Sequence, residues 1–218
     1  MTAKPPGRAP SRGLRGLMGP VNPHESSDDR ARAMGQVPTT GRGSMPYALL
    51  DGEPLVALAS FALEDAGVEL VEFHVDLTRL RDRDRPLVVH DPLCPLTPPG
   101  FIREAVDLAV AEDAVVVGVH PVTDTIKRVD HGVVGDTVDR EGLWTVTSPV
   151  VLPASVVTRL DGWPDADDVA SLVARLRETA VVRFLEAPPL GRRVDDESSL
   201  VLLGALAAEQ PRPAGPDR

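Results

Sequence analysis

Short, uninterrupted runs of β-branched and aliphatic residues are the feature that most restricts what this chain can fold into. One run spans residues 114–119, and another spans residues 86–90 and is followed by Asp91. A strand that is apolar on both sides must be covered on both faces, which is typical of a parallel sheet between layers of helices. These runs therefore predict an α/β fold.

The segments around these runs alternate in type. Apolar residues at helical spacing predict helices, and contiguous apolar residues predict strands. The expected helices are residues 54–65, 98–112, 167–177 (N-capped near Asp165) and 197–209, and the expected strands are residues 70–75, 86–90, 114–119 and 181–185. Residues 31–36 make a poor strand because Arg32, Gly35 and Gln36 interrupt them. The alternation predicts an α/β sandwich around a mostly parallel sheet.

Composition limits the compartment and the kind of core. Hydrophobic residues make up 42% of the 218 residues but aromatic residues only 3%, so Val, Leu and Ala must build the core. No apolar run could span a bilayer, and the N-terminus lacks a signal-peptide core. The single Cys94 rules out an intrachain disulfide and fits a reducing cytoplasm. We therefore expect a cytoplasmic protein without membrane contact.

Charge is distributed unevenly along the chain. Residues 1–45 carry seven Lys or Arg against three acidic residues, a balance of +4, which leaves −14 on the remainder because the net charge is −10. An acidic body argues against nucleic acid as the main partner, since that binding begins with phosphate neutralisation. We expect residues 1–30 to be a disordered basic leader, residues 31–210 one domain, and residues 211–218 a disordered tail.

A hairpin pattern occupies the middle of the chain. Two β-branched runs, residues 122–127 and 137–140, flank a Gly-containing turn at residues 130–132, which predicts a β-hairpin. Its ends bring together hydroxyl, ammonium and guanidinium donors that suit a phosphate, and these are Thr125, Lys127, Thr137 and Arg140. A solvated hairpin with ordinary surface charges is the alternative that spacing leaves open.

His90 and Asp91 end an apolar strand, where ligands of parallel sheets bind. A carboxylate there could orient a ribose hydroxyl or help to hold a metal-bound phosphate, or it could simply cap the following turn. His74 and His120 also lie near strand ends, but no histidine spacing supports a metal site. Cys94 lacks a His/Asn set and is expected to be a buried small residue.

Several motifs follow one another in a distinctive order between about residues 37 and 208. They are His90-Asp91-x-x-x-Pro95, Asp124-Thr125-Ile126-Lys127, Thr137-Val138-Asp139-Arg140-x-x-Leu143-Trp144, Asp167-Asp168 before a helix, and Arg193-Val194 followed by Leu200-x-Leu202. This order resembles the 2-C-methyl-D-erythritol 4-phosphate cytidylyltransferase family. Such enzymes join CTP to methylerythritol phosphate and release pyrophosphate in non-mevalonate isoprenoid biosynthesis.

The resemblance implies a fold, partners and site residues. The fold would be a three-layer α/β/α nucleotidyltransferase (Rossmann-like) sheet with a protruding β-hairpin arm, about residues 121–147, that swaps across a homodimer. The substrates would be CTP and methylerythritol phosphate, with Mg²⁺ if the protein is active. The substrate-binding residues would be Asp91, Thr125, Arg140 and Ser148, where Ser148 replaces a threonine of the family.

The nucleotide side departs from the family pattern. Residues 37–44 look like a shortened Gly-rich loop, in which Thr40, Gly41 and Gly43 would bind the nucleotide, but the family's Arg is absent in register. The family's Pro-Lys dipeptide reads Pro46-Tyr47. Arg42 is the candidate replacement for the missing cation.

Further cations and the base-reading element are also missing. The family's Arg after His-Asp is Cys94 here, its late Lys is Arg193, and the element that reads cytosine has no counterpart. Removing one charged group from such a site can cost about 2–4 kcal/mol of transition-state stabilisation. Two hypotheses remain: a working cytidylyltransferase with Arg42 and Arg193 as catalytic cations, or a catalytically inactive dimeric homologue that binds a phosphorylated sugar alcohol or an active paralogue.

Overall fold

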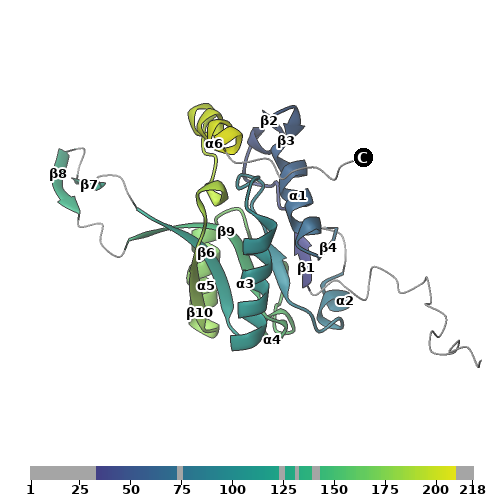
Figure 1. Ribbon diagram of the computed structural model, residues 1–218. Helices are drawn as coiled ribbons and strands as arrows, with labels where there is room; N and C mark the ends of the chain where they lie inside the picture. Colours follow the sequence, from purple (N-terminus) through teal and green to yellow (C-terminus); the bar gives the residue numbers. More distant parts are fainter. Residues whose placement is uncertain (1–32, 73–75, 123–125, 131–132, 139–142, 210–218) are drawn as a thin grey trace, which may run out of the picture.

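A six-stranded sheet forms the centre of the computed structural model, which describes residues 33–72, 76–122, 126–130, 133–138 and 143–209 (Figure 1). The strand order is β10-β6-β9-β5-β1-β4. The strands are β1 (Ala33–Gln36), β4 (Val68–Leu70), β5 (Leu87–Val89), β6 (Val115–Pro121), β9 (Trp144–Leu152) and β10 (Val182–Glu186). All neighbours pair in parallel except β9, which is antiparallel to both β5 and β6. The predicted α/β fold with a mostly parallel sheet is confirmed.

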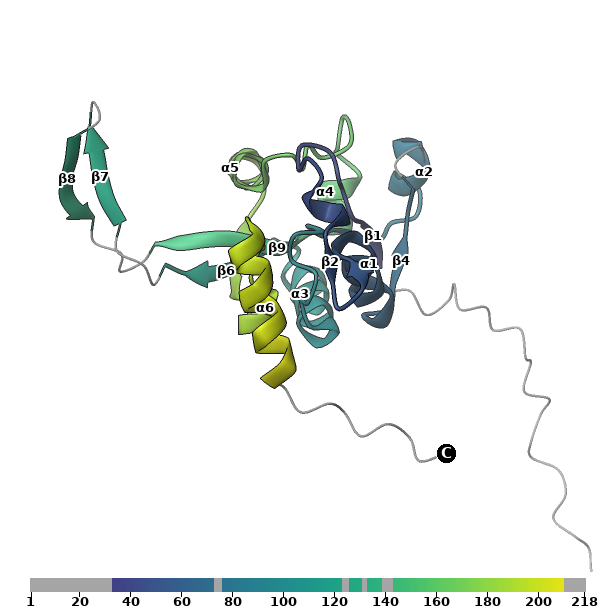
Figure 2. The same ribbon diagram turned by 90° about the horizontal axis from the view of Figure 1, so that it is seen from above.

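Helices cover both faces of this sheet (Figure 2). On one face α1 (Leu55–Asp65) and α3 (Pro99–Glu112) share a core with Val88, Val116 and Val151. On the other face the short helices α2 (Leu77–Arg81) and α4 (Ala154–Val157) and the longer α5 (Val169–Thr179) pack around the alternate residues of the same strands, such as Leu87, Val89, Val115 and Val117. Alternate side chains of a strand point to opposite faces, so each apolar run is buried on both faces of the sheet. The sheet and the helices on its two faces form three layers.

The last helix packs beside the loops at one end of the sheet. Helix α6 (Glu197–Glu209) places Leu203 against Leu50, Leu55, Leu93 and Val194. Near it lie the 3₁₀ turns η2 (Met45–Tyr47) and η3 (Pro189–Gly191) and the small ladder of β2 (Leu49–Leu50) and β3 (Glu53–Pro54). None of the helices in the described part of the chain is long and apolar enough to cross a membrane.

Four helices lie within two residues of their predicted positions, but two strand predictions are wrong. The strand expected at residues 70–75 is instead β4, which ends at Leu70, and residues 73–75 lie outside the described ranges. Residues 31–36 are predicted to be a poor strand, but residues 33–36 form the fully buried β1. A Cβ at Gly35 would lie 2.5 Å from Val68 Cγ1, so the glycine that interrupts the pattern is what lets β4 approach.

The middle of the chain contains the expected pair of antiparallel strands. β7 (Ile126–Asp130) pairs with β8 (Val133–Val138), and Lys127 stands opposite Thr137 in the register. Figure 1 draws this pair apart from the central sheet, at the left. That the pair is an arm reaching a second subunit remains a prediction. The expected leader at residues 1–30 and the tail at residues 211–218 lie outside the described residues.

Candidate active site

The candidate site lies at the carboxyl ends of β1 and β5, which are parallel neighbours. β5 leads directly into His90 and Asp91, and β1 leads into the loop of residues 37–44. Because both strands run in the same direction, their following loops meet at one edge of the sheet, where open α/β sheets bind ligands. The prediction that His90 and Asp91 end a buried strand is confirmed.

Asp91 is the centre of this cluster. Its side chain is 4% exposed, and its Oδ1 accepts hydrogen bonds from Arg42 Nε at 2.8 Å and from the Leu93 amide at 3.0 Å. Its Oδ2 accepts from Arg193 Nε at 3.1 Å. Burial alone would raise the pKa of Asp91, but the hydrogen bond and charge of Arg42, helped by Leu93 and Arg193, hold that pKa below its ordinary value. The carboxylate is therefore ionised, with both oxygens engaged.

Arg42 is a buried bridge between three segments. Besides Asp91, its guanidinium donates through Nη1 to the Thr40 carbonyl at 2.8 Å and through Nη2 to the Ala166 carbonyl at 2.7 Å. Its side chain is only 2% exposed. Gly41, at φ +75°, lets the loop approach Asp167 closely, because a Cβ at this position would lie only 2.8 Å from Asp167 Cγ. The loop is thus held onto the segment that precedes α5, and the charge of Arg42 faces Asp91 rather than open space.

An acidic cavity of about 520 Å³ opens beside this bridge. Of the described residues, the charged ones in its wall are four aspartates and one arginine, namely Asp91, Asp167, Asp168, Asp195 and Arg193. Arg193 is 35% exposed, and besides Asp91 it pairs with Asp195. Trp144, which is 44% exposed, also lines the cavity. The cavity therefore presents more negative than positive charge to a ligand.

Ser148 and His90 fix the turn from within. Ser148 Oγ lies 2.6 Å from His90 Nδ1 and accepts a hydrogen bond from the Asp91 amide at 2.9 Å. Burial lowers the pKa of His90 to about 4, although the charge of Asp91 opposes the shift. His90 is therefore neutral at pH 7. Both side chains are fully buried, so Ser148 supports Asp91 from behind instead of facing the cavity.

The structure gathers several of the predicted site residues and says nothing of two others. Arg42, Asp91, Ser148 and Arg193 meet as described, and Thr40, Gly41 and Gly43 belong to the loop that Arg42 holds. Thr125 and Arg140 lie outside the described residues. The described residues hold no cluster of three side chains able to bind a metal.

Sequence reasoning missed two members of the site. Asp195 pairs with Arg193, and the Ala166 carbonyl receives Arg42. A pattern of side chains cannot reveal a backbone carbonyl that accepts a hydrogen bond. The short Arg193-x-Asp195 spacing, by contrast, could have predicted the ion pair.

Cys94 should be unreactive in the folded protein. It is fully buried, and burial together with the charge of Asp91 raises the pKa of its thiol to about 12. Because the thiolate is the reactive form, iodoacetamide at pH 8 should label it roughly a thousandfold more slowly than a free cysteine. Mass spectrometry measures the labelling, with guanidinium-unfolded protein as the fully reactive control. Rapid labelling of the native protein would contradict this placement.

Comparison with known proteins identifies relatives. A family model described as 2-C-methyl-D-erythritol 4-phosphate cytidylyltransferase (IspD) matches residues 72–182. Proteins of that name are similar to this chain. The one from Synechococcus sp. (strain CC9902) is 35% identical over 145 residues, which cover 63% of this chain and 62% of the relative. The one from Symbiobacterium thermophilum is 40% identical over 143 residues, which cover 62% of this chain and 59% of the relative. The one from Geotalea uraniireducens matches over only 46% of either chain. The chain thus spans about half to three fifths of the length of these relatives.

Solved structures support the fold. The crystal structure of 2-C-methyl-D-erythritol 4-phosphate cytidylyltransferase from Thermus thermophilus superposes with a TM-score of 0.61 and covers 81% of this chain and 99% of its own, at 20% identity. At that identity the similarity establishes the nucleotidyltransferase-like fold alone. The range of the family model includes Asp91, Ser148 and the β7–β8 pair but neither the loop at residues 37–44 nor Arg193.

Proposed function

The chain belongs to the 2-C-methyl-D-erythritol 4-phosphate cytidylyltransferase family, whose model covers just over half of its residues, and from this premise we propose that it is a homologue that no longer transfers a cytidylyl group. In this proposal the protein keeps the fold and the substrate half of the site but not the CTP half. It binds a phosphorylated sugar alcohol, with methylerythritol phosphate as the first candidate, and does not consume CTP.

The family's reaction makes strict demands on charge. An oxygen of the methylerythritol phosphate attacks the α-phosphorus of CTP in line, the bond to the leaving phosphate breaks, and pyrophosphate departs. Negative charge crowds around the reacting phosphorus, so fixed cations aimed at it supply most of the catalysis.

This proposal rests on the observation that the guanidinium of Arg42 is fully occupied by hydrogen bonds within the protein. Its three guanidinium nitrogens donate to Asp91, to the Thr40 carbonyl and to the Ala166 carbonyl. To reach a triphosphate, Arg42 would have to leave a buried carboxylate, and breaking a buried ion pair costs about 3–5 kcal/mol. The side chain that should replace the family's missing cation is therefore used to hold the loop.

The described residues do not assemble a metal site for a triphosphate either. Mg²⁺ in nucleotide sites is held by one or two carboxylates together with phosphate oxygens. Both oxygens of Asp91 already accept from arginines, and Asp168 accepts from the amides of Ala170 and Ser171 at the start of α5. We therefore derive no step through Mg²⁺.

The substrate half of the site would come from the hairpin. In the proposal Thr125 and Arg140 offer a hydroxyl and a planar guanidinium to the substrate phosphate across a homodimer. The inclusion of residues 126–138 in the range that the family model matches supports this assignment. An active paralogue, if one binds here, would replace the second copy.

Calorimetry on the full-length protein tests both halves. Methylerythritol phosphate should bind, and CTP with Mg²⁺ should give no heat of binding. Arg140→Ala should abolish binding of the sugar phosphate, whereas Arg159→Ala, at an exposed site beyond α4, should leave it unchanged. Micromolar CTP binding would overturn the loss of the nucleotide half, and absence of sugar-phosphate binding would overturn the retained half.

A working cytidylyltransferase is the second candidate, and one observation favours it. Arg42, Asp91 and Arg193 converge where α/β sheets bind ligands, and Arg193 is one-third exposed. In this alternative Arg193 turns from Asp91 toward a phosphate. It then serves as a replacement catalytic cation.

A further inference from the structure

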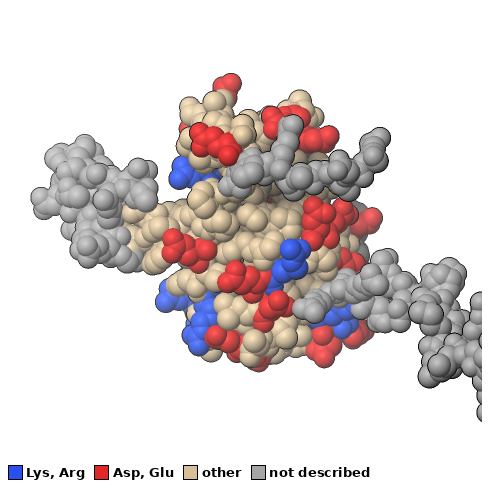
Figure 3. Space-filling view, viewed as in Figure 1, with Lys and Arg blue, Asp and Glu red and all other residues tan. Residues whose placement is uncertain are grey.

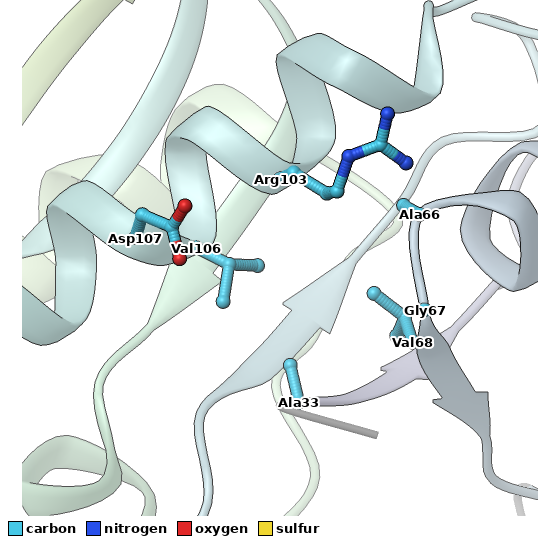
Figure 4. Close-up of a pocket in the computed structure, with 7 residues that line it drawn as sticks. All are labelled: Ala33, Ala66, Gly67, Val68, Arg103, Val106 and Asp107. Carbon is cyan, nitrogen blue, oxygen red and sulfur yellow. The ribbon is translucent and has the colours of Figure 1, made fainter. Parts of the chain in front are cut away.

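Three hollows adjoin one another along the outer face of α3, at the edge of the sheet opposite the candidate site. Their volumes are about 300, 540 and 530 Å³, and Asp107 lines all three. Figure 4 shows the first, where Arg103, Val106 and Asp107 of α3 lie across from Ala33 and Val68. We call the three hollows together the α3 groove.

The groove combines exposed apolar residues with an excess of acidic side chains. Val110 is 60% exposed in it and lies among Ala111, Pro86, Pro153 and Ala154. Its charged lining residues comprise four acidic and two basic side chains, which are Asp84, Glu104, Asp107, Asp113, Arg85 and Arg103. Figure 3 shows acidic side chains over the face of the molecule that α3 forms in this view. An apolar and basic segment would complement this surface.

Residues 1–32 have that chemistry and end at the groove. They contain six Lys or Arg residues and three acidic residues. Their large apolar residues include Leu14, Leu17 and Met18. The first described residue, Ala33, lines the first hollow. At about 3.3 Å per extended residue, 32 residues could run the length of α3 several times over. Tethering at Ala33 also gives the segment a high effective concentration at the groove.

We propose that the basic segment of residues 1–32 docks in the α3 groove of its own chain. The amino ends of β1 and β4 border this groove, whereas the cavity near Asp91 lies at their carboxyl ends. Docking therefore covers Val110 and offsets the excess of acidic side chains in the groove while the candidate site stays open. The proposal is independent of whether that site turns over CTP.

Hydrogen exchange on the full-length protein, followed by mass spectrometry, tests this docking. Amides in residues 1–32 should exchange at least tenfold more slowly than in an unstructured peptide, and 0.5 M NaCl should reduce that protection. Val110→Arg, which places a cation in the groove, should remove the protection. Val201→Arg, the same change at a site on α6 that is 69% exposed, should leave it intact.

Controls keep the outcomes distinct. Amides of β5 and β6 in the same spectra report whether each variant is folded. If Val110→Arg fails to fold, Arg30→Glu combined with Arg32→Glu changes only the docking segment and should give the same loss of protection. Exchange of residues 1–32 at the unstructured rate in the wild type would overturn the proposal. Protection that depends on protein concentration would also overturn it, because a second copy would then fill the groove.

Discussion

Replacing Asp91 with asparagine should lower the free energy of unfolding by about 3–5 kcal/mol. The substitution leaves the guanidinium of Arg42 buried without a counter-charge. It also turns an NH₂ group toward either Arg42 or Arg193, where only an acceptor fits. Chemical denaturation followed by tryptophan fluorescence measures the change.

Two other variants calibrate this prediction. Asp195→Asn also removes a carboxylate partner of Arg193, but an exposed one, and should change stability by no more than about 0.5 kcal/mol. Adding Arg42→Met to Asp91→Asn should recover part of the loss, since the orphaned charge is gone. Equal effects of Asp91→Asn and Asp195→Asn would show that Asp91 is not the buried centre of the cluster.

Acidification from pH 6.5 to pH 4 should lower the free energy of unfolding by about 3 kcal/mol through His90 alone. The pKa of His90 falls from 6.5 to about 4 on folding, chiefly because of burial. Between these values the unfolded chain binds a proton that the folded one does not, so stability is complete above pH 6.5 and declines as the pH falls. Denaturation curves across this range measure the slope.

The difference between wild type and His90→Asn isolates this contribution. The asparagine amide can occupy the position of Nδ1 beside Ser148 but carries no titrating group, so the slope between pH 6.5 and pH 4 should become shallower by about 1 kcal/mol per pH unit on average. Burial and Arg192 also lower the pKa of His120, which is only partly buried, so His120→Asn should remove less of the slope. Identical slopes in wild type and His90→Asn would contradict a buried, neutral His90.

Much of the fold could be predicted because hydrophobic periodicity records it. Residues 55–65, 99–112 and 197–209 are helices where apolar spacing placed them, and the run at residues 115–119 lies in the double-sided core. β1 could not be recognised, because its burial depends on a contact with another strand: Gly35 has no side chain and leaves room for Val68 of β4. β9 was missed because its first two residues are exposed and its buried part contains Pro149.

The position of the site could be predicted, but the hydrogen-bond partners of its residues could not. The rule that ligands bind beyond strand ends located Asp91, and the chain order of the motifs pointed to Arg42 and Arg193. What Arg42 does depends on the Ala166 carbonyl, 124 residues away in sequence. Such a long-range backbone contact follows only from the three-dimensional packing of the loop against the start of α5.

Pyrophosphate release from CTP, methylerythritol phosphate and Mg²⁺ is the most direct test of the loss of the nucleotide half. We expect release at least about a thousandfold below ordinary enzyme rates, with no further fall in Arg193→Ala. Turnover in the ordinary range of about 1–10³ s⁻¹ that Arg193→Ala abolishes would contradict the account and establish a working cytidylyltransferase.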